Sequence, residues 1–330
     1  LVLPLSQKKE IVDMPDIEFF YFIDTSNRLL NSIKLVFKAI QVTKIFKPNI
    51  IHVHSFFAGL LIRPIFAFNK SIKIIYCPHG WSFDRKSGYL FKKISIFIEL
   101  FLSLFSDAII CISDHEMSIA IKNKLPSKKL ITIKNAVNIE YFNKSINILN
   151  VWPKNKLKLL FVGRFDRQKG LDIFLNSLNF LQDEAHAVII GSNVLGDDGN
   201  IQKDYTSFGS ATFVGWKTQD ELIDYYHSAD LIIIPSRWEG FGLVAIEAMS
   251  CGLPVIASKV GGLAEIIVDY ETGRLYENDS SVALTKILKE ITNEDLRKMS
   301  INSVKRVRNL YDISRLDKEI SILYSNLLKT

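Results

Sequence analysis

The sequence predicts an α/β protein made of two consecutive domains, each built on a doubly wound parallel sheet. The chain has 330 residues, well above the length of about 100–150 residues that is commonest for one domain. Short apolar runs alternate with longer amphipathic ones, which is the pattern of repeated strand–helix units. A polar stretch at 143–155 interrupts this alternation once. We therefore predict a linker there, between a first domain over residues 1–150 and a second over 151–330.

In the first half, five short apolar runs are typical of buried strands: Glu18–Phe22, Ile50–His54, Lys73–Cys77, Ala108–Ile112 and Leu130–Ile133. Helical periodicity fills gaps between them, notably over Leu29–Ile45 and Ser113–Leu125. The apolar stretch Ile94–Ile112 has nearly the length of a membrane span, but Glu99 and Asp107 interrupt it and are costly in hydrocarbon. We interpret it as a buried helix that leads into a buried strand.

The second half repeats the pattern with five strand candidates: Lys158–Val162, Ala187–Ile190, Thr212–Val214, Leu231–Ile234 and Val255–Ala257. The helices expected among them are Leu171–Leu181, Gln219–Ser228 and Leu243–Ser250, and a last helix near Ser314–Leu328 is expected to pack back on the first domain. Doubly wound sheets bind ligands at the carboxyl ends of their strands. A chain with two such domains is expected to bind its ligand in the cleft between them.

Charge is unevenly distributed along the chain. Residues 1–150 contain 20 Lys and Arg against 11 Asp and Glu, a net charge of +9, and residues 151–330 contain 21 against 24, a net of −3. The basic half either meets an anionic partner, such as a membrane surface, or carries scattered solvated lysines, and composition leaves both open. Nucleic acid is not expected as a partner, because the sequence has no interleaved arginine and aromatic platform and no known binding motif.

The three cysteines, Cys77, Cys111 and Cys251, lie in or beside apolar runs, without partners at metal-ligand spacing. We interpret them as small buried thiols in a reducing compartment. Nothing near Leu1 has the basic and then apolar pattern of a signal peptide. We expect a cytoplasmic location, and the charge argument extends this expectation to peripheral contact with the inner face of the cell membrane.

One motif follows the strand Leu231–Ile234, in the segment from Pro235 to Glu247. Gly240 and Gly242 let the backbone approach a ligand closely, and the helix that follows turns its positive end toward it. This arrangement suits a diphosphate. Glu239 and Glu247 repel phosphate, but they can accept hydrogen bonds from sugar hydroxyls.

A second motif follows the strand Lys158–Val162, where Gly163 frees the turn and Arg164 and Lys169 add positive charge. Taken alone, these two cations would be interpreted as solvated loop residues. Because both motifs lie at strand exits of the same predicted domain, we expect Arg164 and Lys169 to lie at the cleft rather than on a solvated loop.

Together these residues resemble the family 4 glycosyltransferases of the GT-B fold, whose two Rossmann-like domains face each other across a cleft. The resemblance is specific over the second half. It rests there on Gly163-Arg164, Lys169-Gly170, Pro235-Ser236, Glu239-Gly-Phe-Gly with Glu247 eight positions after Glu239, Glu247–Pro254, Val260–Gly262 with Glu265, and Thr272-Gly273. It is looser over the first half, where it rests on Ile51–Ser55, Pro78-His79-Gly80, Cys111–Ser113 and Asn135–Asn138. Ala136 and Asn138 depart from the Gly and Asp usual there, which we interpret as turn variation.

The resemblance implies a role for each site residue. Arg164 and Lys169 would hold the donor diphosphate, and Glu247 would bind the ribose hydroxyls. Glu239 would contact the donor sugar and phosphates together with the backbone amides around the following turn, Gly240, Phe241, Gly242 and Leu243. His79 of the first domain would reach the reacting sugar, which makes His79 and Glu239 the expected catalytic residues. We interpret His52 and His54 as core or rim residues.

The resemblance also implies transfer of a sugar from a nucleotide-sugar donor to a glycan or lipid-linked acceptor, with retention of configuration, in the synthesis of cell-surface polysaccharide. No metal or other cofactor is expected, because Arg164, Lys169 and a helix N-terminus can stabilise the leaving diphosphate. The sequence has no Asp-x-Asp pair for a divalent ion. We interpret Asp197-Asp198 as part of a solvated loop.

Family members normally open with a strand, a Gly-rich loop, a helix and a second strand. Here no glycine precedes Gly59, so the resemblance predicts that this opening unit is missing. Other classes of protein compete with this interpretation. A non-catalytic partner with the same fold or a nucleotide-sugar epimerase remains an alternative. A dinucleotide-dependent oxidoreductase would need a G-x-G-x-x-G motif after an early strand, which the sequence lacks.

Overall fold

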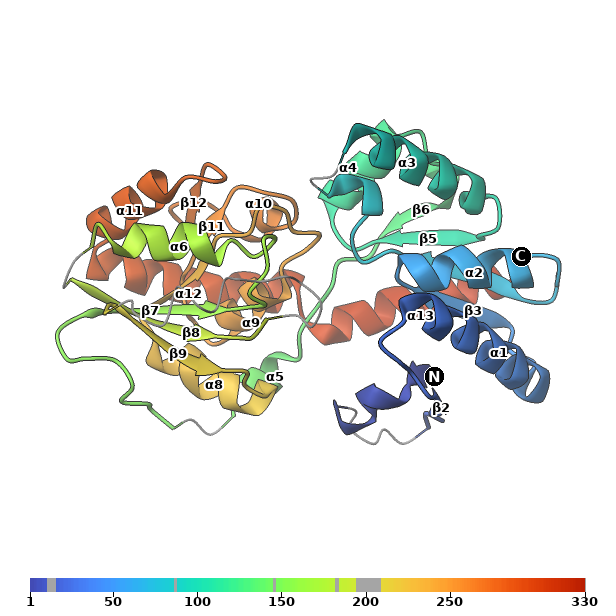
Figure 1. The fold of residues 1–330 in the computed structure, drawn as a ribbon, viewed down its shortest axis with the longest axis horizontal. Helices are drawn as coiled ribbons and strands as arrows, with labels where there is room; N and C mark the ends of the chain where they lie inside the picture. The colour runs from blue at the N-terminus through green and yellow to red at the C-terminus, as the bar shows by residue number, and fades with distance from the viewer. Residues whose placement is uncertain (11–15, 86–87, 145–146, 182–183, 194–208, 330) are drawn as a thin grey trace. The chain divides into compact units, whose positions relative to one another are not determined.

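The computed structural model describes residues 1–10, 16–85, 88–144, 147–181, 184–193 and 209–329 (Figure 1). Its contacts divide the chain into two compact units, which we describe separately. The first unit comprises Leu1–Ile112, Glu116–Ile133 and the residues from Ile320 onward, and the second comprises Ser113–His115 and Lys134–Glu319. The domain boundary at residue 150 stays a prediction, because contacts alone do not show which segment folds by itself.

The main sheet of the first unit has four parallel strands in the order β3-β4-β5-β6. Their bounds are β3 Ile50–His54, β4 Lys73–Cys77, β5 Ala108–Cys111 and β6 Leu130–Thr132, within one residue of the predicted ones. The helices of this part of the chain are α1 Arg28–Phe46, α2 Phe56–Phe66, α3 Tyr89–Ser103 and α4 Asp114–Lys122. Short 3₁₀ turns cover Leu5–Glu10, Ser82–Asp84 and Ser127–Lys129.

A separate two-stranded parallel sheet lies at the start of the chain, where β1 (Val2–Pro4) pairs with β2 (Phe20–Phe22). The prediction that the first strand begins near Glu18 is therefore wrong. Three residues ending in a proline are too short to show the alternation by which a strand is recognised in sequence. Only the pairing with β2 defines this strand.

The sheet of the second unit has six parallel strands in the order β12-β11-β10-β7-β8-β9. Their bounds are β7 Leu157–Val162, β8 Ala185–Ile190, β9 Ala211–Gly215, β10 Leu231–Ile234, β11 Val255–Ser258 and β12 Gly273–Tyr276. The chain moves outward from β7 to β9, returns to place β10 on the other side of β7, and then moves outward again. The strand order therefore reverses between β7 and β10, where doubly wound sheets bind their ligands.

Helices cover both faces of this sheet, with α6 and α11 on one face and α8, α9 and α12 on the other (Figure 1). The helices of this part of the chain are α5 Ile139–Phe142, α6 Leu171–Leu178, α8 Gln219–Ser228, α9 Leu243–Ser250, α10 Leu263–Ile266, α11 Ser281–Glu290, α12 Asn293–Leu310 and α13 Ile313–Lys329. Side chains of β7, α6 and α11, among them Phe161, Phe174 and Leu284, form a continuous buried core. This core holds the strand ends of the second unit in place.

A buried polar cluster joins three elements of the first unit. The guanidinium of Arg63 on α2 donates to the Glu99 carboxylate on α3 at 2.8 Å, and the Tyr76 hydroxyl on β4 donates to the other oxygen of that carboxylate at 3.0 Å. The guanidinium also stacks on the Tyr76 ring, 3.7 Å from its centroid. Because Arg63 and Glu99 are both fully buried, each charge depends on the other for compensation.

The sequence interpretation of Ile94–Ile112 is half correct. The strand β5 within it is buried, but α3 is not a buried helix, since Phe97 and Phe101 are exposed. The apolar periodicity did not show which side of the helix packs, and the buried Glu99 fixes that side. Among the helices that the structure describes, none combines the length and the apolar character needed to cross a bilayer.

We predict that Glu99→Gln strongly destabilises the first unit. The substitution leaves the buried Arg63 charge without its counter-charge, and breaking a buried pair costs about 3–5 kcal/mol. The midpoint of urea unfolding, followed by fluorescence, measures the loss. Lys286→Gln is the control, because it removes a charge from an exposed pair with Glu290 and should leave the midpoint near that of the wild type. Equal midpoints for Glu99→Gln and the wild type would contradict the prediction.

Candidate active site

The candidate site of the second unit is formed by two loops that leave adjacent parallel strands. Residues 163–170 follow β7, and residues 235–242 follow β10. The strands pair directly, with Leu159 opposite Leu231. Their carboxyl ends therefore meet at the same sheet edge, where the strand order reverses, which is the usual ligand position in this kind of fold.

Backbone contacts hold the two loops against each other. The Arg237 N–H donates to the Gln168 carbonyl at 2.7 Å, and the Gln168 side-chain amide donates to the Trp238 carbonyl at 3.1 Å. Gly170 has a φ of 66°, and a Cβ at this position would lie 2.1 Å from the Pro235 carbonyl oxygen. Only glycine permits this approach. The packing of the two loops therefore explains why a glycine follows Lys169 in the sequence.

The Arg237 side chain fixes the second loop from the other side. Its guanidinium donates to both oxygens of Asp172 at 2.9 and 2.6 Å, and to Asp279 at 2.5 Å. These hydrogen bonds with Asp172 are the main cause that raises the pKa of Arg237, so the group stays charged. A two-point arginine–carboxylate contact also sets orientation. Arg237 therefore anchors the loop that carries Glu239.

Lys169 and Glu239 form an ion pair across the two loops. The Lys169 Nζ lies 2.6 Å from Glu239 Oε2, and the Ser236 hydroxyl donates to the same oxygen at 3.3 Å. Only 20% of the Lys169 side chain and 13% of the Glu239 side chain are exposed. Partial burial weakens solvent screening, so this pair is held more firmly than a surface pair. The structure thus brings together two of the residues expected to contact the donor.

Helix α9 begins four residues after Glu239. Gly242 caps it with a φ of 109°, Leu243 is its first residue, and Phe241 is buried with its ring edge-on to Tyr311. The Gly262 N–H donates to the Glu239 carbonyl at 3.1 Å, and a Cβ at Gly261 would lie 1.8 Å from that oxygen. The backbone from Gly240 to Leu243 is therefore held closely, with the positive end of the helix at the loop.

Glu247 and Arg164 have partners of their own. The Tyr226 hydroxyl, buried on α8, donates to Glu247 Oε2 at 3.0 Å, and burial raises the pKa of Glu247. Arg164 is about half exposed and contacts Asp166 at 3.0 Å and Gln168 at 3.2 Å, within its own loop. These polar contacts of Glu247 and Arg164 are made with residues other than Lys169 and Glu239. The partners Tyr226 and Gln168 carry no motif signal, so sequence reasoning missed them.

His79 belongs to the first unit and lies in a turn after β4, with a φ of 52°. Its Nε2 is 2.8 Å from Nδ1 of His54, which ends β3. The His54 ring stacks on that of His52 at a centroid distance of 4.2 Å, and His52 Nδ1 is 2.9 Å from the Tyr324 hydroxyl on α13. Of the two histidines interpreted as core or rim residues, His54 therefore contacts His79 directly, and His52 contacts His54.

This cluster also includes a possible metal-ligand set. One ligand atom each of His54, Cys77 and His79 lies within 4.8 Å of the others, a set of nitrogen and sulfur donors that suits a soft divalent ion. Spacing along the sequence did not reveal it, because the register of the sheet places Cys77 opposite His54. The Asp197-Asp198 pair lies outside the described residues, so its interpretation as a loop stays a prediction.

Burial also affects the protonation of these histidines. Burial first, and the charges of His54 and His79 second, lower the pKa of His52 to about 3. Burial lowers the pKa of His79 in the same direction. Because an ordinary histidine has a pKa of about 6.5, both rings are held neutral at neutral pH. His79 can therefore meet a ligand as an uncharged hydrogen-bonding group.

A parallel six-stranded sheet with a cationic side chain, a carboxylate and a helix N-terminus near its reversal point is typical of α/β enzymes that bind phosphate-containing ligands. Residues 145–307 match the family described as glycosyl transferases group 1, and residues 8–141 match the one described as glycosyltransferase family 4. The chain belongs to this family and is a retaining glycosyltransferase of the GT-B fold.

Three similar proteins illustrate the relationship. A 41.2 kDa protein in the cps region of Klebsiella pneumoniae is 35% identical over 87% of this chain and 81% of its own length. The UDP-Gal:α-D-GlcNAc-diphosphoundecaprenol α-1,3-galactosyltransferase of Escherichia coli is 25% identical over 93% of this chain and 84% of its own. The structure of sucrose-phosphate synthase from Thermosynechococcus elongatus superposes with a TM-score of 0.82 at 23% identity, over 97% of this chain and 85% of its own. The similarity to sucrose-phosphate synthase, at this identity, shows the fold alone.

We predict that His52 does not take up a proton between about pH 8 and pH 5, because its pKa in the folded state lies far below the ordinary value. Neutral His52 therefore contributes stability that is complete above about pH 6.5 and is lost as the pH falls toward 3. Titration of the histidine C2 protons by NMR measures this, with His52→Gln to assign the signal. A midpoint near 6.5 for His52 would contradict the prediction.

Proposed function

We propose that this enzyme moves a sugar from a nucleotide-sugar donor to a glycan or lipid-linked acceptor, in the synthesis of a cell-surface polysaccharide at the inner face of the cell membrane. One observation carries the donor half of the proposal. The mostly buried Lys169–Glu239 pair lies at the reversal point of the sheet, and Glu239 precedes the first residue of α9 by four positions. Positive charge, backbone N–H groups and a carboxylate so close together support binding of a sugar diphosphate.

The role proposed for Lys169 follows from its contacts. An ammonium group has three protons to donate, and the 2.6 Å contact with Glu239 uses one of them. The others can reach the donor phosphates, while the ion pair keeps the ammonium in position. Arg164 adds a second cation from the same loop. As the bond from the sugar to the diphosphate breaks, both cations and the first amides of α9 stabilise the negative charge that develops.

Carboxylates and a neutral imidazole serve the sugar parts of the donor. Tyr226 donates to one oxygen of Glu247, and the carboxyl can accept from the ribose hydroxyls through the other. Glu239 would accept from hydroxyls of the donor sugar. Neutral His79 would hydrogen-bond the reacting sugar. The acceptor would attack the face that the diphosphate leaves, which retains the anomeric configuration.

The substrate class proposed here follows the printed name of one relative. The Escherichia coli protein uses UDP-galactose and a sugar linked to diphosphoundecaprenol, and it matches 93% of this chain. We propose a UDP-hexose donor and an acceptor on a lipid diphosphate. The basic first half of the sequence, with a net charge of +9, fits an acceptor and a membrane surface that are both anionic.

We predict that Lys169→Ala and Arg164→Ala each lower kcat about 10²–10³-fold, the usual effect of removing one donor of charge stabilisation. UDP-, GDP- and ADP-sugars are first ranked by the thermal shift that each causes. Transfer from the best donor to lipid-diphosphate-linked sugar is then measured. Arg167→Ala is the control, because it removes an exposed cation of the same loop. Near-wild-type turnover by both variants, or no shift with any nucleotide sugar, would overturn the proposed function.

Transfer is further expected to persist in EDTA. The charge that a divalent ion would supply comes here from Lys169, Arg164 and the N-terminus of α9, so removal of metal should leave the rate within a few-fold of its starting value. The same assay, run with and without the chelator, checks this. Complete loss of transfer that manganese or magnesium restores would show that the diphosphate is neutralised by an ion.

A further inference from the structure

Helix α3 leaves a long apolar stripe exposed on the surface. A helix on the surface of a water-soluble domain buries its apolar stripe and exposes polar residues. In α3 the fully buried side chains are Ser95, Glu99, Leu102 and Ser103, and Ile96 and Leu100 pack partly buried against the core. The opposite stripe, at helical spacing and including the residue that caps the helix, is apolar and between 50% and 71% exposed: Leu90, Ile94, Phe97, Phe101 and Leu104. Tyr89 and Phe91 add two more exposed rings at the start of the helix.

The packing of Glu99 causes the apolar stripe of α3 to be exposed, and its contact with water is unfavourable. Glu99 must face inward to meet Arg63 and Tyr76, and this fixes the rotation of α3 about its axis. The residues on the far side, among them Phe97 and Phe101, therefore point away from the core. Burying an apolar side chain of this size is worth about 1.5–3 kcal/mol. Contiguous apolar patches of this kind on a surface mark contact sites.

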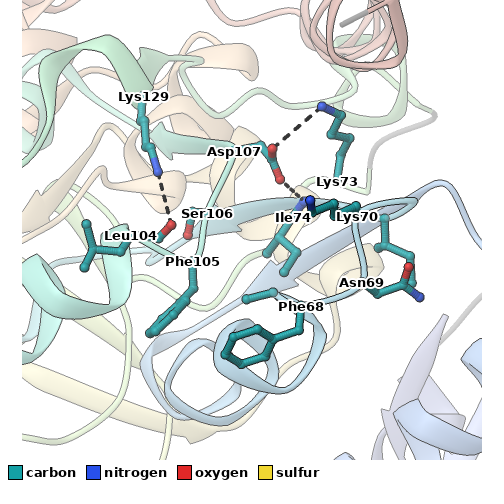
Figure 2. Close-up of a pocket in the computed structure, with 12 residues that line it drawn as sticks. Phe68, Asn69, Lys70, Lys73, Ile74, Leu104, Phe105, Ser106, Asp107 and Lys129 are labelled. Carbon is teal, nitrogen blue, oxygen red and sulfur yellow. Dashed lines mark hydrogen bonds and ion pairs between the residues drawn. The ribbon is translucent and has the colours of Figure 1, made fainter.

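Lysines accompany the stripe at both ends. Lys92 and Lys93 lie within its first turn, and the Lys93 ammonium is 4.5 Å from the centroid of the Tyr89 ring. At the other end the structure has a pocket of about 570 Å³, which Leu104 lines together with Phe68 and Phe105 (Figure 2). Phe68, which is 84% exposed, extends the apolar surface beyond the helix.

The same pocket is lined by three lysines (Figure 2): Lys70, Lys73 and Lys129. Lys129 donates to the Leu104 carbonyl at 3.3 Å, and Lys73 lies 3.9 Å from Asp107. Asp107 is the one carboxylate among the lining residues. This surface combines apolar side chains with an excess of ammonium groups. A matching partner has hydrocarbon and negative charge in adjacent layers, as the surface of an anionic bilayer does.

We propose that the exposed stripe of α3 and the adjoining basic pocket dock on the surface of an anionic bilayer. With a rise of 1.5 Å per residue, the stripe from Leu90 to Leu104 is about 21 Å long, so it lies along the membrane plane. Its rings enter the headgroup boundary, and the lysines contact lipid phosphates at about 1 kcal/mol each. A second copy of the chain fits this surface less well, because two such faces would bring like charges together.

The test is sedimentation of the full chain with vesicles of phosphatidylcholine alone or mixed equally with phosphatidylglycerol. We expect binding to the mixed vesicles, little binding to the neutral ones, and a steep loss with added salt. Phe97→Ser/Phe101→Ser should weaken binding to mixed vesicles at least about tenfold, because the variant lacks two rings that would be buried in the bilayer. Lys92→Gln/Lys93→Gln should weaken it less. The matched control is Ile301→Ser on α12, which changes an apolar side chain as exposed as Phe97 and should bind like the wild type.

Three outcomes would overturn the proposal: equal binding to both vesicles, binding unchanged in Phe97→Ser/Phe101→Ser, or a dimer of the wild type in size-exclusion chromatography that this variant converts to a monomer. The proposal extends the membrane partner of the proposed function, but vesicle binding requires no sugar transfer. The thermal shift caused by the donor nucleotide should be the same in the variants and the wild type. A variant that loses vesicle binding but keeps the nucleotide-induced thermal shift has lost docking while its donor site is intact. The two failures are therefore distinguishable.

Discussion

The donor site depends on the close approach of two loops that leave adjacent parallel strands. The hydrogen bond from the Arg237 N–H to the Gln168 carbonyl and the contact of Gly170 with Pro235 leave no room for a side chain between the loops. This approach brings Lys169 within 2.6 Å of Glu239. A side chain at Gly170 would separate the loops, and the charge arrangement at α9 would be lost with it.

A second constraint, in the first unit, shows how one buried charge affects a distant surface. Glu99 is neutralised by Arg63 and hydrogen-bonded by Tyr76, so α3 cannot rotate to bury its rings without breaking that cluster. The apolar stripe of α3 that includes Phe97 and Phe101 consequently faces outward. In the sequence the same residues suggested burial, since periodicity gives the spacing of an apolar stripe but not the side to which it turns.

Sequence patterns located most strands closely, because buried parallel strands are continuous apolar runs. The runs Ile50–His54, Lys73–Cys77 and Leu231–Ile234 agree with β3, β4 and β10 residue for residue. The misses are elements without such a run. The strand β1 ends in a proline, and β12 begins with Gly273 and has Arg274 at its second position. Both are defined only by the strand that pairs with them.

The sequence by itself determined the family, the two parallel sheets and the motifs of the donor half, because glycines and charges at strand exits carry a signal within a few residues. Only the tertiary structure decided the partners: Lys169 with Glu239, Glu247 with Tyr226, and His79 with His54. These pairs join residues that lie from 21 to 70 positions apart in the chain. Their distances follow from strand register and helix rotation, which the packing of the whole unit sets and no local pattern records.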